Sequence, residues 1–207
     1  MISLRNAFIL LLIVILSYSC SKSGEEQIDL ETLPDLNGKS VVMIIASRDF
    51  RDEELQEPES ILEQKGAQVT IACSALGEAK GMKGMKVKPD ISLDQVNVED
   101  YDAVIFIGGS GAKEYWNDSK AHSIARETVA ADKVLGAICI APVTLANAGV
   151  LNGKRATVYS SEKGKLEAAG ADYTGADVQV DGKIITANGP EAAARFGEAI
   201  ARALGES

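Results

Sequence analysis

The chain has 207 residues and a formal net charge of −9, from 30 acidic and 21 basic side chains. This length suits one globular domain with a substantial core, and the acidic balance argues against nucleic-acid binding, because no basic patch is available to displace counterions from phosphate. Three cysteines are too few for the disulfide framework of a small secreted protein.

The N-terminus, residues 1–19, is predicted to be a signal peptide. Arg5 precedes an apolar run from Ala7 to Leu16, which is short for a membrane span but has the length of a signal-peptide core. Cleavage before Cys20 would resemble processing at the lipid-attachment site of bacterial lipoproteins, although Tyr18 stands where those signals prefer a small residue. We therefore expect an extracytoplasmic protein tethered to a membrane through Cys20, with a secreted or periplasmic protein and a retained anchor as alternatives.

Residues 20–38 are polar and acidic and lack a sustained apolar period, so they are interpreted as a tether. The domain is expected to span residues 39–207. There, short apolar runs alternate with longer helical periods, which is typical of a parallel sheet covered on both faces.

The expected elements follow in chain order. Strands are predicted at 40–46, 68–72, 103–107, 134–138 and 156–159. Helices are predicted at 53–65, 119–131, 143–149 and from Pro190 to Leu204, with a weaker one from Ser161. A hairpin or edge strands are expected within 80–90, and the Asp-Gly pair at 181–182 predicts a second hairpin over 178–186.

The joint between residues 134–138 and 143–149 contains Cys139. A sharp turn from a buried strand to a helix would lift this side chain out at the carboxyl end of the sheet. Free N–H groups at the start of the helix favour negative charge there, so we expect the thiol to be shifted toward the reactive thiolate. The alternative is that Cys139 is only a small buried hydrophobic residue.

Four segments together resemble the DJ-1/PfpI (ThiJ/PfpI) superfamily. They are Phe50–Leu55 followed by Pro58, Phe106–Gly109, Ala137–Pro142 and Ala187–Pro190. The likeness covers nearly all of the chain from Lys39 to Leu204. It implies an α/β fold, namely a flavodoxin-like three-layer sandwich with a mostly parallel sheet and a nucleophile elbow, in a homodimer or higher homo-oligomer.

The resemblance also implies roles for individual residues. Cys139 matches the family's reactive cysteine, and Glu54 matches the acidic residue that hydrogen-bonds to that thiol. Gly109 matches the glycine whose N–H faces the cysteine, and the N–H of Ile140 would be its partner in an oxyanion hole. The alternative for Glu54 is a first-turn carboxylate favoured by the helix dipole.

Gly108, Tyr159 and Asn188 are further candidates for the pocket around Cys139. The glycine-rich segment 108–111 lacks the Lys-Ser/Thr ending of a phosphate-binding loop, so a tight turn is favoured. Tyr159 fits an ordinary strand aromatic and a hydroxyl donor equally well. Cys73 is expected to be structural.

The chain departs from the family pattern in its histidines. Hydrolytic members carry His directly after the cysteine, where this chain has Ile140, and the DJ-1 branch has a His whose position falls on Tyr159. The only histidine, His122, is expected to be a solvated helix residue and a poor metal ligand. No Cys–His dyad is predicted, and cysteine protease activity is therefore disfavoured.

Three functions remain open. The first is glyoxalase- or deglycase-like action on small carbonyl compounds, with Cys139 attacking the aldehyde carbon and Glu54 moving a proton. The second is a redox-responsive or protective role in which an oxidant converts Cys139 to a sulfinate. The third is a non-catalytic binding module. No metal ion or organic cofactor is expected, and contact with a membrane is expected only through the N-terminal lipid or anchor.

Overall fold

The computed structural model describes residues 28–206. The predicted signal peptide, residues 1–19, and the lipid-attachment residue Cys20 lie outside this range. Among the described residues, no helix has both the length and the apolar character needed to span a bilayer.

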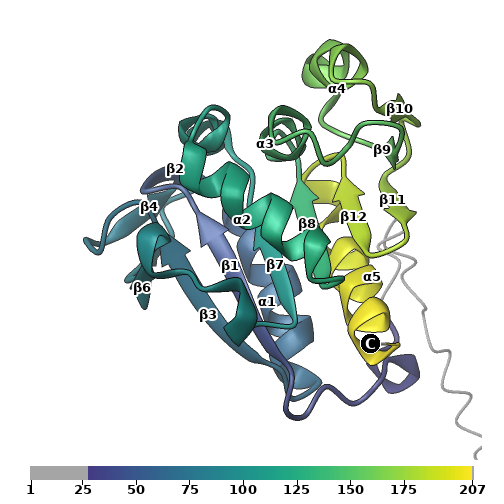
Figure 1. Ribbon diagram of the computed structural model, residues 1–207. Helices are drawn as coiled ribbons and strands as arrows, with labels where there is room; N and C mark the ends of the chain where they lie inside the picture. The colour runs from purple at the N-terminus through teal and green to yellow at the C-terminus, as the bar shows by residue number, and fades with distance from the viewer. Residues whose placement is uncertain (1–27, 207) are drawn as a thin grey trace, which may run out of the picture.

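A seven-stranded sheet forms the centre of the domain, in the order β11-β12-β8-β7-β1-β3-β6. All its pairings are parallel except that of β11 with β12. Figure 1 shows these strands side by side at the centre of the domain. The central strands are largely apolar runs, as expected where both faces of a parallel sheet are covered. The strands are β1 (Ser40–Ile45), β3 (Gln68–Cys73), β6 (Ile91–Ser92), β7 (Ala103–Phe106), β8 (Val134–Ile138), β11 (Val178–Asp181) and β12 (Ile184–Ala187).

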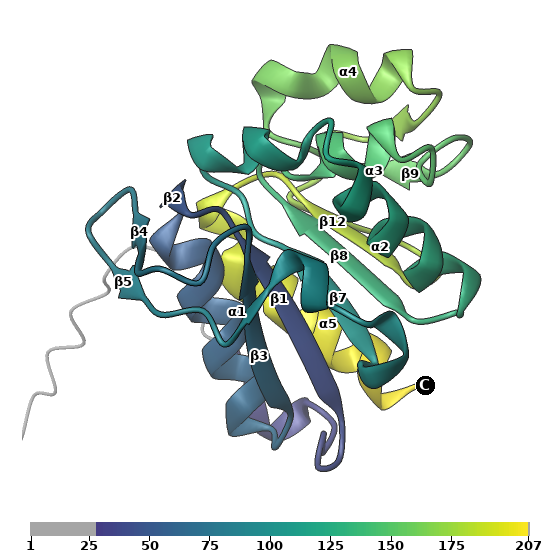
Figure 2. The same cartoon turned by 60° about the vertical axis from the view of Figure 1, so that its left-hand side comes forward.

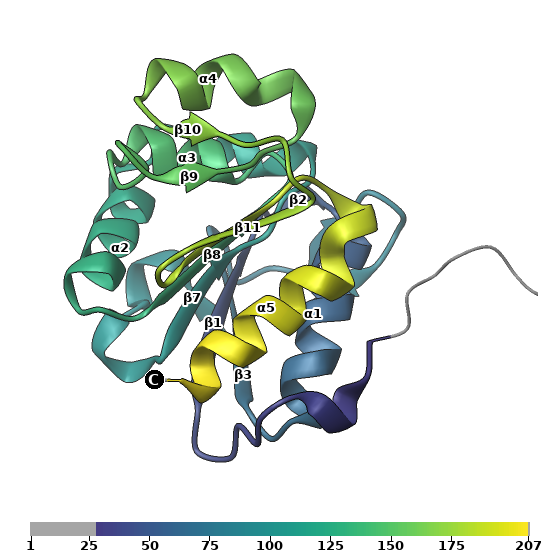
Figure 3. The ribbon, with the colours of Figure 1, turned by 90° about the vertical axis from the view of Figure 1, so that its right-hand side faces the viewer.

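Helices cover the two faces of this sheet. Figure 3 shows α1 (Asp52–Gln64) and α5 (Ala193–Gly205) on one face, and α2 (Ser119–Ala130) on the other, where α3 (Pro142–Asn147) also packs. Strand β1 shows how the sequence produces the layers. Val41, Met43 and Ile45 point into the core with α1 and α5, whereas Val42 and Ile44 point into the opposite core. The predicted flavodoxin-like three-layer sandwich is confirmed.

Several smaller elements lie outside the central sheet. Strands β2 (Arg48–Phe50), β4 (Ala79–Gly81) and β5 (Lys86–Val87) form a separate sheet, and the antiparallel pair β4–β5 is the hairpin predicted within 80–90. Figure 2 shows this hairpin beside β2 and the start of α1. The other elements are β9 (Arg155–Ala156), β10 (Asp172–Tyr173), α4 (Lys163–Ala168), η1 (Leu30–Thr32), η2 (Leu93–Gln95), η3 (Val98–Asp100), η4 (Ser110–Tyr115), η5 (Ser160–Glu162) and η6 (Pro190–Ala192).

The strand predicted at 156–159 is wrong in extent, because only its first residue belongs to β9. The next N–H, that of Thr157, donates to the side-chain hydroxyl of Thr186 at 2.9 Å. The N–H of Tyr159 donates to the carbonyl of Cys139 at 2.8 Å. These bonds take the chain out of the strand ladder and turn it over the end of β8.

The described part of the expected tether, residues 28–38, packs on the domain instead of leading away from it. Leu33 and Leu36 are buried in the core beside α1 and α5, and the N–H of Leu36 donates to the carbonyl of Lys65 at 2.7 Å. With Leu30 they form an apolar face at every third residue, which the acidic composition of the segment conceals. The folded domain therefore begins before Lys39.

Candidate active site

Cys139 lies at a sharp turn between β8 and α3. It has a φ of +62°, a backbone conformation that costs energy for any residue with a side chain. Neighbouring segments hold this conformation: the N–H of Cys139 donates to the carbonyl of Ala187 at 2.9 Å, and the carbonyl of Cys139 accepts from the N–H of Tyr159. The arrangement is that of a nucleophile elbow, as the resemblance implied.

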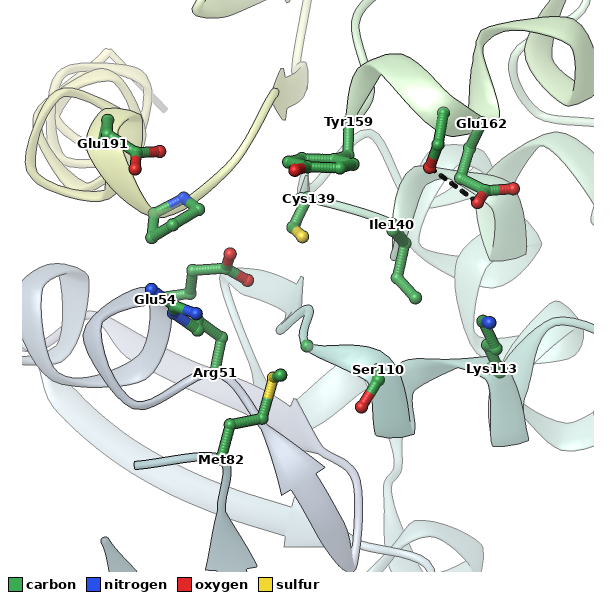
Figure 4. A pocket seen from close by; sticks show the side chains of 13 residues that line it. Arg51, Glu54, Met82, Ser110, Lys113, Cys139, Ile140, Tyr159, Glu162 and Glu191 are labelled. Carbon is green, nitrogen blue, oxygen red and sulfur yellow. Dashed lines mark hydrogen bonds between the residues drawn. The ribbon is translucent and has the colours of Figure 1, made fainter. Parts of the chain in front are cut away.

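Glu54, in the first turn of α1, is fully buried. Neither of its carboxyl oxygens makes a hydrogen bond of regular geometry with any residue in 28–206. The carboxyl points toward the thiol of Cys139 (Figure 4), and the thiol and the N–H of Gly108 lie near enough to lower its pKa. A buried carboxyl that is aimed at a cysteine and lacks a structural partner is unusual, because buried polar groups are normally paired.

The chain must have glycine at position 108 for these two side chains to meet. A Cβ placed there would lie 2.4 Å from Oε2 of Glu54 and 2.5 Å from Cβ of Cys139. Both distances are well inside van der Waals contact. Gly108 follows β7, so three separate elements, α1, β7 and the turn after β8, contribute to one contact.

The environment raises the pKa of both acidic groups. Burial raises the pKa of Glu54 to about 8. The thiol of Cys139, the charge of Arg51 and the N–H of Gly108 lower this pKa, but by less than burial raises it. Burial, followed by the charge of Glu54, raises the pKa of Cys139 to about 12, although the N–H groups of Gly109 and Ile140 act in the opposite direction. Because the groups are in contact, their protons are lost in steps that belong to the pair.

The expected shift of Cys139 toward the thiolate is therefore wrong, because burial raises the pKa of the thiol. The helix that was expected to acidify the thiol is short and begins at Pro142, which has no N–H to offer. The remaining amides do not outweigh burial. Below about pH 8, however, Glu54 is neutral, so the repulsion from its charge disappears and its O–H can donate to a thiolate or another anion at Cys139.

Two backbone N–H groups face the sulfur, those of Gly109 and Ile140. Gly109 has a φ of +93°, and a Cβ there would lie 2.4 Å from the backbone nitrogen of Arg51, so no larger residue fits without rearrangement. The N–H of Ile140 shares a peptide plane with the carbonyl of Cys139, and that carbonyl accepts from the N–H of Tyr159 at 2.8 Å, which fixes the direction of the N–H. Both N–H groups therefore act on the same atom, the sulfur of Cys139.

A cavity of about 380 Å³ opens over this group (Figure 4). Four of the predicted site residues line it, namely Cys139, Glu54, Gly109 and Ile140, and so does the pocket candidate Tyr159. The residues that line it are Arg51, Glu54, Met82, Gly109, Ser110, Lys113, Cys139, Ile140, Tyr159, Ser161, Glu162, Pro190 and Glu191.

Other predicted residues lie elsewhere. Asn188 does not line the cavity, because its Nδ2 donates to Oδ1 of Asp177 at 2.9 Å. His122 is not solvated as expected: it is partly buried, and its Nε2 lies 2.9 Å from the carbonyl oxygen of Trp116, away from the cavity lining. Cys73 is buried in the core. No cluster of three potential metal ligands occurs within the described chain.

Sequence reasoning missed Arg51 and Met82, which both line the cavity. Arg51 precedes Glu54 by three residues at the start of a helix, and this spacing alone places the two on one side of the first turn. Met82 lies in the turn of the β4–β5 hairpin, and an apolar residue in an exposed turn is the feature of the sequence that could have pointed to a binding surface.

Comparison with known proteins agrees with this architecture. The model of the DJ-1/PfpI family matches residues 39–203. An uncharacterized protein of Methanocaldococcus jannaschii is 39% identical over 203 residues, which cover 97% of both chains. A deglycase of Pyrococcus horikoshii is 35% identical over 149 residues, covering 72% of this chain and 90% of that protein. The crystal structure of a ThiJ/PfpI domain protein from Brachyspira murdochii has a TM-score of 0.80 and 28% identity, covering 82% of this chain and 99% of that one. The chain belongs to the DJ-1/PfpI family.

Proposed function

We propose that this protein converts small α-oxoaldehydes and related carbonyl compounds, with Cys139 as nucleophile and Glu54 as proton carrier. The observation that carries the proposal is the contact between the fully buried carboxyl of Glu54 and the thiol at the elbow. Its position at the floor of a cavity gives a substrate access to both groups. The related deglycase of Pyrococcus horikoshii supports the same class of chemistry.

The first step would form a bond between the sulfur of Cys139 and the aldehyde carbon. The thiol proton ends on the aldehyde oxygen, giving a hemithioacetal. While negative charge develops on that oxygen, the N–H groups of Gly109 and Ile140 are placed to stabilise it.

Glu54 would then remove the hydrogen on the former aldehyde carbon as a proton and return a proton to the neighbouring keto carbon. The hydroxyl proton of the hemithioacetal passes to the keto oxygen, so the keto group becomes a hydroxyl group and the hemithioacetal becomes a thioester of Cys139. Water hydrolyses the thioester and restores the thiol. The sum is α-oxoaldehyde plus water giving a 2-hydroxy acid, so one carbon is oxidised, its neighbour is reduced, and no external oxidant is needed.

The test is to incubate the purified domain with methylglyoxal near pH 8 and to measure lactate. We expect Cys139→Ala to abolish formation of lactate and Glu54→Gln to lower kcat by about 100-fold or more, the scale of general acid–base catalysis. Cys73→Ala, which removes the buried thiol of the core, is the matched control and should retain activity. Equal lactate formation by wild type and Cys139→Ala would refute the proposal. A Cys139 that is also inert to alkylation would favour a binding module instead.

A redox role is the second candidate, and the buried carboxyl of Glu54 that points toward the thiol of Cys139 is the observation that favours it. An O–H at this position can donate to an oxygen of a sulfinate at Cys139, without help from a histidine. Two molecules of peroxide would each transfer one oxygen to the sulfur and be reduced to water. Mass spectrometry should then show two added oxygens on wild type and none on Cys139→Ser. Loss of this product in Glu54→Gln would assign the stabilising group.

We also propose that the chain is lipidated at Cys20. Ile28 already packs against the domain, and a fully extended segment from residue 20 to residue 28 spans at most about 29 Å. The lipid would therefore hold the domain close to the bilayer surface. Labelling with a radioactive fatty acid in a bacterial host tests this, and Cys20→Ser should remove the label and release the domain from membranes.

A further inference from the structure

The cavity above Cys139 is larger than methylglyoxal requires. Its volume is about 380 Å³, whereas a cavity of about 150 Å³ is enough to bind benzene. A three-carbon aldehyde attached to Cys139 would leave much of the space filled with water. The walls of the unused part therefore indicate which substituent a better substrate carries.

Two exposed apolar side chains form opposite walls of this cavity. Tyr159 and Met82 are 47% and 46% exposed, and both line it. Figure 4 shows the ring of Tyr159 next to the thiol of Cys139 and the thioether of Met82 across the cavity. Ile140 and Pro190 add further apolar surface. An aromatic ring and a polarisable thioether both make favourable contacts with a flat aromatic group.

Backbone contacts hold both walls in relation to the reactive pair. The N–H of Tyr159 donates to the carbonyl of Cys139. On the other side, the N–H of Met82 donates to the carbonyl of Phe50 at 2.9 Å, and the buried carboxylate of Asp52 accepts from the N–H groups that follow Met82 in the hairpin. A group between these walls would thus have a defined position relative to the sulfur.

The charged side chains at the rim offer less selectivity. Arg51 forms an ion pair with Glu53, with 2.8 Å between Nε and Oε2. Glu162 forms an ion pair with Lys165 and accepts from the hydroxyl of Ser161. At Arg51 and Glu162 an ionic substituent on a substrate would have to displace a protein partner, whereas the apolar walls are open. The other charged side chains of the rim, Lys113 and Glu191, are of opposite sign, so they give the cavity no overall preference for one charge.

We propose that the cavity selects carbonyl compounds that carry a flat apolar group, with aromatic 2-oxoaldehydes as the simplest class, bound between Tyr159 and Met82. This inference rests on the proposed function of Cys139. It adds a substrate class and two residues that determine specificity.

The first test measures binding without turnover, by protection of Cys139 against iodoacetamide in the presence of benzamide or acetamide. We expect benzamide to slow alkylation at concentrations at least about fivefold lower than acetamide, the scale of one aromatic contact. Tyr159→Ala and Met82→Ala should lose this difference, whereas Tyr159→Phe, which keeps the ring, should retain it. Leu76→Ala, which removes an exposed apolar side chain outside the cavity, should not affect it. Equal protection by the two amides, or unchanged protection in Tyr159→Ala, would overturn the inference.

The second test compares conversion of phenylglyoxal to mandelate with conversion of methylglyoxal to lactate. We expect kcat/KM to be at least about fivefold higher for phenylglyoxal, with the advantage lost in Tyr159→Ala through a rise in KM. Equal kcat/KM values would overturn the inference and leave the proposed function intact. If neither compound is converted faster than by Cys139→Ala, the proposed function fails, and the protection experiment alone decides whether the cavity binds aromatic groups.

Discussion

The carboxyl group of Glu54 and the side chain of Cys139 meet over the Cα of Gly108. A Cβ at that position would lie within 2.5 Å of an atom of each residue. The contact joins the first turn of α1 to the turn after β8 at the end of a third element, β7. The carboxyl group and the thiol can therefore exchange a proton only because residue 108 has no side chain between them.

Gly108→Ala should separate this pair. The added methyl group has no space on either side, so we expect a loss of about 1 to 3 kcal/mol in unfolding free energy, as for other overpacked sites. Turnover should fall to the level of Glu54→Gln or below. Urea unfolding and lactate formation measure the two effects. Gly77→Ala is the control, since a Cβ there meets nothing within 4 Å, and a Gly108→Ala variant as active as this control would contradict the prediction.

Alkylation of Cys139 should be slow at pH 7 and become faster as the pH rises through about 8. Below that pH, Glu54 and Cys139 are both protonated. Above it one proton remains on the two groups, and in part of the population this proton is on Glu54, which leaves Cys139 as a thiolate. Rate constants for iodoacetamide between about pH 5 and pH 10 measure the profile.

In Glu54→Gln the step near pH 8 should disappear. The thiol would then titrate alone and below about 12, because the repulsion from the Glu54 charge is removed. A wild-type profile that already reaches its plateau at about pH 6 would show that the thiolate is stabilised and that burial does not dominate.

The fold was largely predictable from sequence, because its signals are local. The strand Val134–Ile138, for example, is a short apolar run next to a helical pattern, and it is found at the predicted residues. The acidic segment before Lys39 was misjudged because it adds to the core through contacts with residues that are distant in the sequence. Leu33 and Leu36 are buried by contacts with α1 and α5, and these exist only in the folded domain.

The candidate site shows the same division. Cys139 could be recognised from its position between strand and helix, but its pKa could not. The loss of solvation at the thiol depends on how the elbow packs, and the sequence does not encode burial directly. Asn188 was misplaced for a similar reason, because its bond to Asp177 is a tertiary contact that turns the side chain away.

Glu54→Gln should raise stability at alkaline pH more than at acidic pH. The pKa of Glu54 is raised to about 8 in the folded protein from its ordinary value of 4.5, so the folded state binds the proton more tightly than the unfolded chain. The stabilisation from the neutral carboxyl is therefore complete below about 4.5 and is lost as pH rises through about 8. Glutamine has no charge to bury and avoids this loss.

Thermal unfolding measured across this pH window tests the prediction. For a domain of this size, each kcal/mol corresponds to about 2 to 4 °C in Tm, so the difference between Glu54→Gln and wild type should grow by several degrees toward pH 9. Glu63→Gln, which changes an exposed carboxyl group on the same helix, should follow the wild-type curve. Parallel curves for wild type and Glu54→Gln would mean that the carboxyl keeps its ordinary pKa.

Asp52→Ala should loosen the β4–β5 hairpin. The buried carboxylate of Asp52 accepts from the N–H of Lys83 at 2.9 Å and from that of Met85 at 2.7 Å. Its removal leaves two backbone donors without their partner, at a cost of about 1 to 3 kcal/mol. Because the loss is local, trypsin should cut faster after the lysines of the hairpin, as measured by mass spectrometry over time. Asp94→Ala, which removes an exposed carboxylate from a short helical turn, should leave the rate unchanged. Cleavage of Asp52→Ala at the rate of that control would show that the hairpin is held by other contacts, and the wall formed by Met82 would not depend on Asp52.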